Sequence, residues 1–184
     1  MKQILLPLAL SLSASLAHAA CPAPKDQDAR LQALIDAVKI APDQTSAQLI
    51  SNEMWDIWDD APDEKAQSLL NDGLVRRSNQ DFDGALDAFE ALIEYCPNYA
   101  EGYNQRAFIL FIKQDYPPAL IDLERAIALS PKHIAAITGK ALTLIALERD
   151  EEAQAVLRAA LALNPWLKER QFLTEEAEPP KTDL

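Results

Sequence analysis

Residues 100–131 read AEGYNQRAFILFIKQDYPPALIDLERAIALSP, and this stretch decides the fold because its pattern occurs three times. The same residue types return 34 positions earlier and 34 positions later, without insertion or deletion. The positions that repeat most clearly are one alanine and one proline: Ala85, Ala119 and Ala153, and Pro97, Pro131 and Pro165. A fixed period of this length is typical of a solenoid of stacked helix pairs. Scarce glycine and abundant alanine and leucine agree with an all-α fold.

Residues 66–165 resemble three tetratricopeptide repeats. In that family a large residue stands at position 4, small residues at 8 and 20, and proline at 32. Here position 4 is Leu69, Tyr103 and Ile137, and position 8 is Gly73, Ala107 and Ala141. The resemblance implies a right-handed α-solenoid with repeats at residues 66–99, 100–133 and 134–167. The first repeat fits least well, because Leu92 replaces the small residue at position 27.

An N-terminal helical hairpin precedes the repeats, within residues 20–62. After a proline-bearing extended lead-in, apolar residues follow helical spacing in two segments: Leu31, Leu34, Ile35 and Val38, then Ile50, Met54, Ile57 and Trp58. We interpret the hairpin as a degenerate first unit that covers the exposed end of the stack. Trp55 and Trp58 are then expected to pack between the hairpin and the first repeat, rather than to form a ligand site.

The C-terminal end is predicted to carry a short capping helix at residues 168–173. The remaining residues, 174–184, are acidic, contain two prolines and have no apolar stripe. We expect this tail to be disordered.

The N-terminus predicts export. Residues 1–19 combine Lys2, an apolar run and the small residues of Ala17-His18-Ala19, which is the pattern of a cleaved signal peptide. No later stretch is long and apolar enough for a membrane helix, so we expect no membrane insertion of the mature chain and a periplasmic or secreted location. A lipoprotein signal is the alternative, but His18 stands where that signal wants a leucine-like residue, three before Cys21.

The mature chain has two cysteines, Cys21 and Cys96. Exported proteins fold in an oxidising compartment, so an even number of cysteines favours one disulfide. We predict that Cys21 pairs with Cys96 and fixes the lead-in beside the end of the first repeat.

Composition argues against several function classes. The net charge is −12, which disfavours nucleic acid as a partner. The mature chain has one histidine, His133, expected at the surface or at a helix start, and it contains no metal-ligand motif, glycine-rich phosphate loop or nucleophile motif. We therefore expect no catalytic residues, no cofactor and no metal. The clustered acids at residues 56–64 are interpreted as a solvated helix end.

The resemblance also implies a concave groove, lined by the first helix of each repeat, that binds a protein or peptide partner. Family positions 2, 5, 9, 12 and 13 face this groove, and among the residues at those positions our candidate groove residues are Leu70, Leu74, Arg77, Asn104, Phe108, Phe111, Leu142 and Ile145. Asn104 and Arg77 are expected to bind backbone or carboxylate groups of the partner. Alternatively, the N-terminal hairpin folds into this groove and fills it. The basic cluster with which some family members clamp a C-terminal carboxylate is absent.

These observations predict a non-enzymatic, exported scaffold or adaptor for protein–protein interaction in the bacterial envelope. The alternative is an outer-membrane lipoprotein that assists assembly of a pilus or secretion complex.

Overall fold

The computed structural model describes residues 20–174, and the helical part of that range begins at Asp28. Its elements, in chain order, are α1 (Asp28–Lys39), α2 (Gln44–Trp58), α3 (Glu64–Ser78), α4 (Phe82–Tyr95), α5 (Ala100–Ile112), α6 (Tyr116–Leu129), α7 (Ile134–Ala146), α8 (Asp150–Leu163) and the short 3-10 helix η1 (Lys168–Phe172). The described residues form no strand. The predicted signal peptide and all but the first residue of the predicted tail lie outside the described residues.

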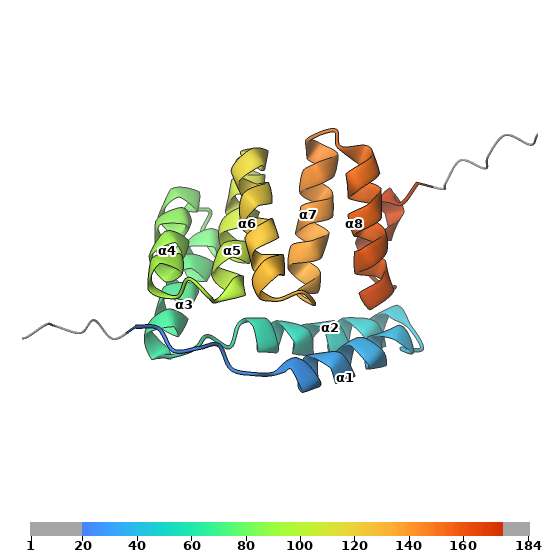
Figure 1. The fold of residues 1–184 in the computed structure, drawn as a ribbon, viewed down its shortest axis with the longest axis horizontal. Helices are drawn as coiled ribbons and strands as arrows, with labels where there is room; N and C mark the ends of the chain where they lie inside the picture. Colours follow the sequence, from blue (N-terminus) through green and yellow to red (C-terminus); the bar gives the residue numbers. More distant parts are fainter. Residues whose placement is uncertain (1–19, 175–184) are drawn as a thin grey trace, which may run out of the picture.

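Six of these helices form a stack of three pairs, in which α3 packs on α4, α5 on α6, and α7 on α8. Figure 1 shows the pairs side by side, with neighbouring helices running in opposite directions. The predicted all-α fold of repeated helix pairs is therefore confirmed. Between 20 and 174, none of the helices combines the length and the apolar character that crossing a bilayer requires.

Small residues allow the helices of each pair to approach closely. Ala85, Ala119 and Ala153 are completely buried. A Cβ atom added to Gly73 of α3 would lie only 2.3 Å from Cε1 of Phe89 in α4. The repeated small residues thus stand where a larger side chain would push the two helices apart.

The turn inside each pair also repeats, through a feature that the sequence patterns did not predict. Gln80, Gln114 and Glu148 adopt left-handed backbone conformations, with φ values of 63°, 62° and 59°. The next residue donates its N–H back to a carbonyl of the helix that has just ended, as from Asp81 to Arg76 at 3.0 Å. This arrangement ends the first helix and reverses the chain into the second.

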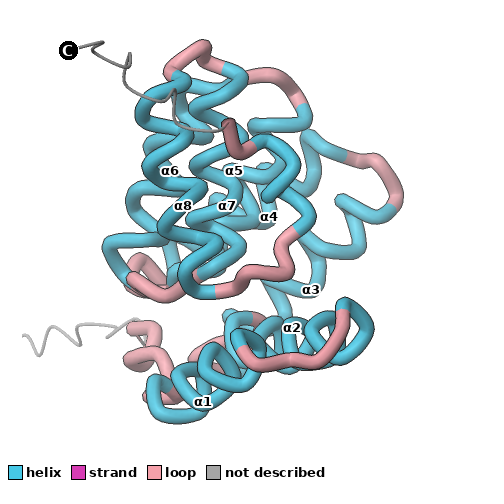
Figure 2. Tube along the Cα trace, turned by 90° about the vertical axis from the view of Figure 1, so that its right-hand side faces the viewer, coloured by secondary structure: helices cyan, strands magenta, loops and turns pink. Residues whose placement is uncertain are grey.

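The N-terminal hairpin does not stack on the first repeat, so the prediction of an end cap is wrong. Helices α1 and α2 instead run beneath the repeats, across their lower ends (Figures 1 and 2). The apolar stripe of α1 and α2 forms one cluster with residues of the third repeat and its C-terminal extension, namely Ile134, Ala135, Leu163, Trp166 and Leu167. The hairpin therefore packs along the stack and does not extend it at the first repeat.

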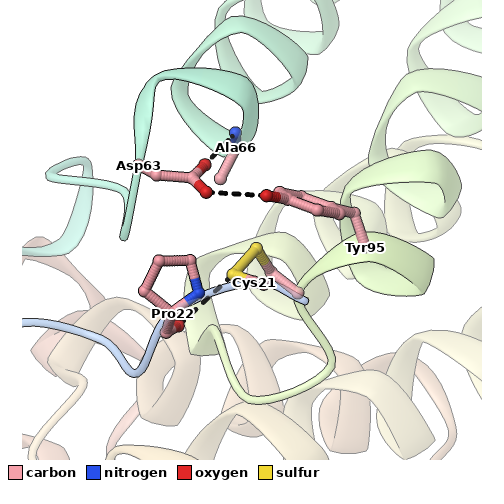
Figure 3. The surroundings of a disulfide bond; sticks show 6 residues. Cys21, Pro22, Asp63, Ala66 and Tyr95 are labelled. Carbon is pink, nitrogen blue, oxygen red and sulfur yellow. Dashed lines mark hydrogen bonds between the residues drawn. A yellow bond between two sulfur atoms is a disulfide. The ribbon is translucent and has the colours of Figure 1, made fainter. Parts of the chain in front are cut away.

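The structure contains the predicted disulfide, between Cys21 and Cys96, with the two Cα atoms 5.1 Å apart (Figure 3). The lead-in that follows Cys21 is held further by Lys25 and Gln27, which both bind the carboxylate of Asp60. The segment between the disulfide and α1 is thereby attached to the stack at several points.

Close to the disulfide, Asp63 begins α3 by capping it. Its carboxylate accepts the N–H of Ala66 at 2.8 Å and the hydroxyl of Tyr95 at 2.7 Å (Figure 3). Both hydrogen bonds stabilise the charged form, and they lower the pKa of Asp63. The start of the first repeat is therefore tied to the end of α4.

Candidate functional site

A groove of about 760 Å³ lies between α2 and the first helices of the repeats. Helix α2 supplies one wall, through residues that include Met54, Trp55 and Trp58. Helices α3, α5 and α7 supply the opposite side, and residues 164 and 166–169 contribute at the C-terminal end. The two predicted alternatives were an open groove and a groove filled by the hairpin. In the structure the hairpin forms one wall of the groove and does not fill it.

Six of the eight predicted groove residues line this groove: Leu74, Arg77, Asn104, Phe108, Phe111 and Leu142. Phe108 is 48% exposed although it is a large apolar side chain. The guanidinium of Arg77 lies over the ring of Phe108, with its Cζ atom 5.3 Å from the ring centroid. The groove therefore presents uncovered apolar surface with one cation beside it.

The other two predicted groove residues, Leu70 and Ile145, do not line it. Leu70 is completely buried in the core cluster that contains Phe89, Tyr99 and Ile109. The turn from α2 to α3, including Ala61, packs over the same cluster and takes Leu70 out of the groove. Ile145 packs against the cluster of Leu120, Leu144 and Ala153 between the second and third repeats.

Behind the groove lies a buried polar network that the sequence analysis missed. Oε2 of Glu101, in the first turn of α5, lies 2.7 Å from Nε2 of His133, and both side chains are almost completely buried. Nδ1 of His133 accepts the N–H of Ala136 and so caps α7. Because Nδ1 is an acceptor, the proton shared with Glu101 belongs to Nε2, and the imidazole is neutral.

The network continues from Glu101 toward the groove. Glu101 also accepts hydrogen bonds from the amide nitrogens of Asn104, at 3.0 Å, and Gln105. Gln105 in turn accepts from Arg77. Asn104 and Arg77 were predicted to bind a partner, and the structure shows that each already has an intramolecular contact.

Trp58 of α2 packs against this network. Its indole stacks on the imidazole of His133, and its backbone carbonyl accepts the hydroxyl of Tyr99 at 2.5 Å. Trp58 thus contacts Tyr99 at the end of the first repeat, where the sequence analysis placed it, and also His133 at the end of the second repeat. The burial of His133 rules out the surface position that we considered for it.

Three polar atoms near the groove have no hydrogen-bond partner among the described residues: Nε1 of Trp58, Oδ1 of Asp59 and Oγ1 of Thr138. All three residues line the groove. Burial and the nearby charge of Glu101 raise the pKa of Asp59 to about 6, because both disfavour its ionised form. Buried polar atoms are normally paired, so these three exceptions distinguish the groove from the rest of the described fold.

Within residues 20–174, no three His, Cys, Asp or Glu side chains are grouped as a metal site would require. The groove is instead lined by apolar, aromatic and amide side chains with a few charges. Surfaces of this composition bind peptides and other proteins.

Comparison with known proteins shows that this chain is similar to tetratricopeptide-repeat proteins. Residues 134–165 match the family model described as tetratricopeptide repeat. A TPR repeat-containing protein of Rhizobium etli is 29% identical over 115 residues, which cover 62% of this chain and 56% of that protein. A tetratricopeptide repeat protein 36 homolog of Nematostella vectensis is 39% identical over 72 residues, or 39% of this chain and 40% of that protein. The chain thus spans about half the length of these curated relatives, or less.

Solved structures show the same architecture. The TPR2B domain of yeast Sti1, solved as a complex with pHsp70, aligns with a TM-score of 0.54 and 27% identity, covering 59% of this chain and 83% of that domain. The first TPR of Spaghetti (RPAP3), solved bound to the HSP90 peptide SRMEEVD, aligns with a TM-score of 0.58 and 24% identity. That alignment covers 59% of this chain and 86% of that domain.

Proposed function

We propose that this chain is a tetratricopeptide-repeat protein, and that it holds a partner protein by binding an extended segment of that partner in the groove beside α2. The observation that carries the proposal is the uncovered apolar surface around Phe108, in a concave site of a size suited to a peptide. Two similar domains were solved with peptide or protein ligands, which supports the same use here.

A photo-crosslinking amino acid at position 108 tests this proposal in cells. We expect one predominant protein adduct, because the side chain at this position points into the groove. The matched control places the crosslinker at Ile121, which is 67% exposed on α6 and is not a groove residue. Equal adducts at both positions, or none at 108, would count against the proposal.

We further propose that the protein acts outside the cytoplasm, as an exported, non-enzymatic scaffold or adaptor of the bacterial envelope. Residues 1–19 and the disulfide support this location, because disulfides persist in oxidising compartments. Cell fractionation with mass determination of the mature N-terminus tests it. A cytoplasmic protein that retains residues 1–19 would refute the location and leave the groove proposal standing.

The lipoprotein alternative conflicts with the disulfide. A lipid on Cys21 would be attached through its Sγ atom, and in the structure that atom is bonded to Cys96. One sulfur cannot carry both bonds, so we do not favour a lipoprotein that assists pilus or secretion assembly. The same N-terminal mass measurement would detect a diacylated Cys21.

A further inference from the structure

We infer that the groove selects partner segments that carry a lysine or arginine, and that Asp59 receives the cationic head of that side chain. The inference rests on the proposed function, because it assigns the chemistry of the segment that the groove holds. It follows from an unpaired carboxylate, an excess of negative charge around it, and an aromatic wall beside it.

The carboxylate of Asp59 is incompletely satisfied. Asp59 follows the last residue of α2 and lines the groove. Its Oδ1 atom is shielded from water without accepting a hydrogen bond, and no cation between residues 20 and 174 forms an ion pair with it. Burying a carboxylate oxygen without a partner costs free energy, and an entering cation would recover that cost.

The groups around Asp59 carry an excess of negative charge. Asp59 and Glu101 are acids, and the groups that lower the pKa of Asp59 are Arg77 and His133. Arg77 is already bound to Gln105. His133 adds no charge in the tautomer that its two contacts require, and the exposed Asp56 adds a further negative charge on α2. A cation therefore complements this part of the groove, and an anion does not.

An aromatic wall adjoins the carboxylate and suits the stem of a long basic side chain. The rings of Trp55 and Trp58 meet edge to face with centroids 5.3 Å apart, and Trp55 is 36% exposed. The methylene groups of lysine or arginine pack well on such rings, and their charged heads are attracted to the ring faces. This favours a basic side chain over a small inorganic cation.

Two buried polar side chains indicate that the ligand also offers a polypeptide backbone. Trp58 is 7% and Thr138 8% exposed, and each has one polar atom without a partner. An extended peptide carries carbonyl acceptors and N–H donors that could satisfy the indole N–H of Trp58 and the hydroxyl of Thr138, given a small local movement. The occupant is therefore a basic peptide segment.

Two basic side chains of the groove itself would favour an acidic partner segment instead. Arg77 and the exposed Lys168 both line the groove. An acidic segment that reached them would leave Asp59 unpaired and would place its own charge near Glu101. We make this possibility one outcome of the test.

Selection from a displayed library of random peptides, about eight residues long, tests the inference on the full mature chain. The variants are Asp59→Asn, which removes the carboxylate charge, and Glu53→Gln, the matched control at an exposed position of α2 that does not line the groove. We expect enrichment of lysine and arginine with the wild type and the control, and loss of that enrichment with Asp59→Asn. A selected lysine peptide should bind Asp59→Asn about tenfold more weakly, and its acetyl-lysine form should bind both proteins equally.

The outcomes separate the inference from the proposed function. Peptides selected without basic residues, or with acidic ones, would overturn the role of Asp59 and leave the groove as a peptide site. If the wild type enriches peptides no more strongly than Phe108→Ser does, both the role of Asp59 and the proposed peptide-binding function of the groove are overturned. Because Asp59→Asn removes an unfavourable charge, loss of folding is not expected to obscure the result.

Discussion

The indole of Trp58 stacks on the imidazole of His133, with ring centroids 4.4 Å apart and an interplanar angle of 12°. Trp58 belongs to the N-terminal hairpin, and His133 caps the first helix of the third repeat. One buried contact therefore joins two segments that are 75 residues apart in sequence. Together with the apolar cluster that joins α1 and α2 to Ile134, it attaches the hairpin to the repeats.

Replacing Trp58 with alanine should lower the free energy of unfolding by about 3–5 kcal/mol, because it removes a large buried ring and uncovers His133. Urea denaturation followed by circular dichroism measures the loss. Trp55→Ala is the control, since Trp55 is partly exposed and contacts Trp58 from the groove side. Equal losses in the two variants would contradict the importance of the buried contact between Trp58 and His133.

Replacing Cys21 with alanine should destabilise the protein by about 4 kcal/mol, because the disulfide closes a long loop and restricts the unfolded chain. The sequence separation of the two cysteines is 75 residues. Thermal unfolding with and without reductant measures the effect. Reductant should lower the midpoint of the wild type toward that of the variant and leave the variant unchanged; a wild-type midpoint insensitive to reductant would refute this.

Replacing Gly73 with alanine should cost about 1–2 kcal/mol, although alanine is the better helix former. The new methyl group would meet the ring of Phe89 at 2.3 Å in a completely buried position. Gly102→Ala is the matched control, because its methyl group would meet Ile93 at 3.2 Å and the flexible side chain of Leu92 at 3.4 Å. Denaturant midpoints should rank Gly73→Ala below Gly102→Ala, and the reverse order would contradict close packing at position 73.

Asp59 should make stability depend on pH in an unusual direction. Its pKa in the folded state is raised to about 6 from 3.8, so the folded protein binds its proton more tightly than the unfolded chain does. The contribution of Asp59 to stability is therefore greatest below pH 3.8 and is lost as pH rises through about 6. Asp43 and Asp63, whose pKa values are lowered, contribute in the opposite direction.

The difference between Asp59→Asn and wild type isolates this effect. We expect the variant to be more stable by about 1 kcal/mol near pH 7, after allowance for solvent screening of a partly exposed carboxylate. The advantage should shrink toward pH 4. Denaturation series at several pH values measure it, and an advantage that stays constant with pH would show that Asp59 titrates normally.

The repeats could be predicted because the same local needs recur every 34 positions: a small residue where two helices touch, and a residue that ends a helix. Ala119 has to be small wherever two helices touch, and Pro131 has to follow a helix that ends. The disulfide followed from the parity of two cysteines in an exported chain. These inferences did not require knowledge of how distant segments pack.

The position of the hairpin could not be predicted in the same way. The stripe that contains Met54 and Trp58 shows which face of α2 is apolar, but it does not say which surface that face will meet. Glu101 and His133 are separated by 32 residues, and each one alone reads as an ordinary surface residue. The left-handed backbone at Gln80, Gln114 and Glu148 could not be predicted either, because none of these residues is the glycine or asparagine that usually marks this conformation. The three positions nevertheless recur at the repeat period.

The course of α1 and α2 across the lower ends of the repeats also bears on how the protein unfolds. In a simple solenoid each unit touches only its neighbours, so terminal units fray before the centre. Here one covalent bond holds the hairpin's lead-in to the first repeat, and α1 contacts α8 of the third. Loss of either terminal repeat would therefore release the hairpin, and we expect the array to melt in a single cooperative transition rather than from its ends.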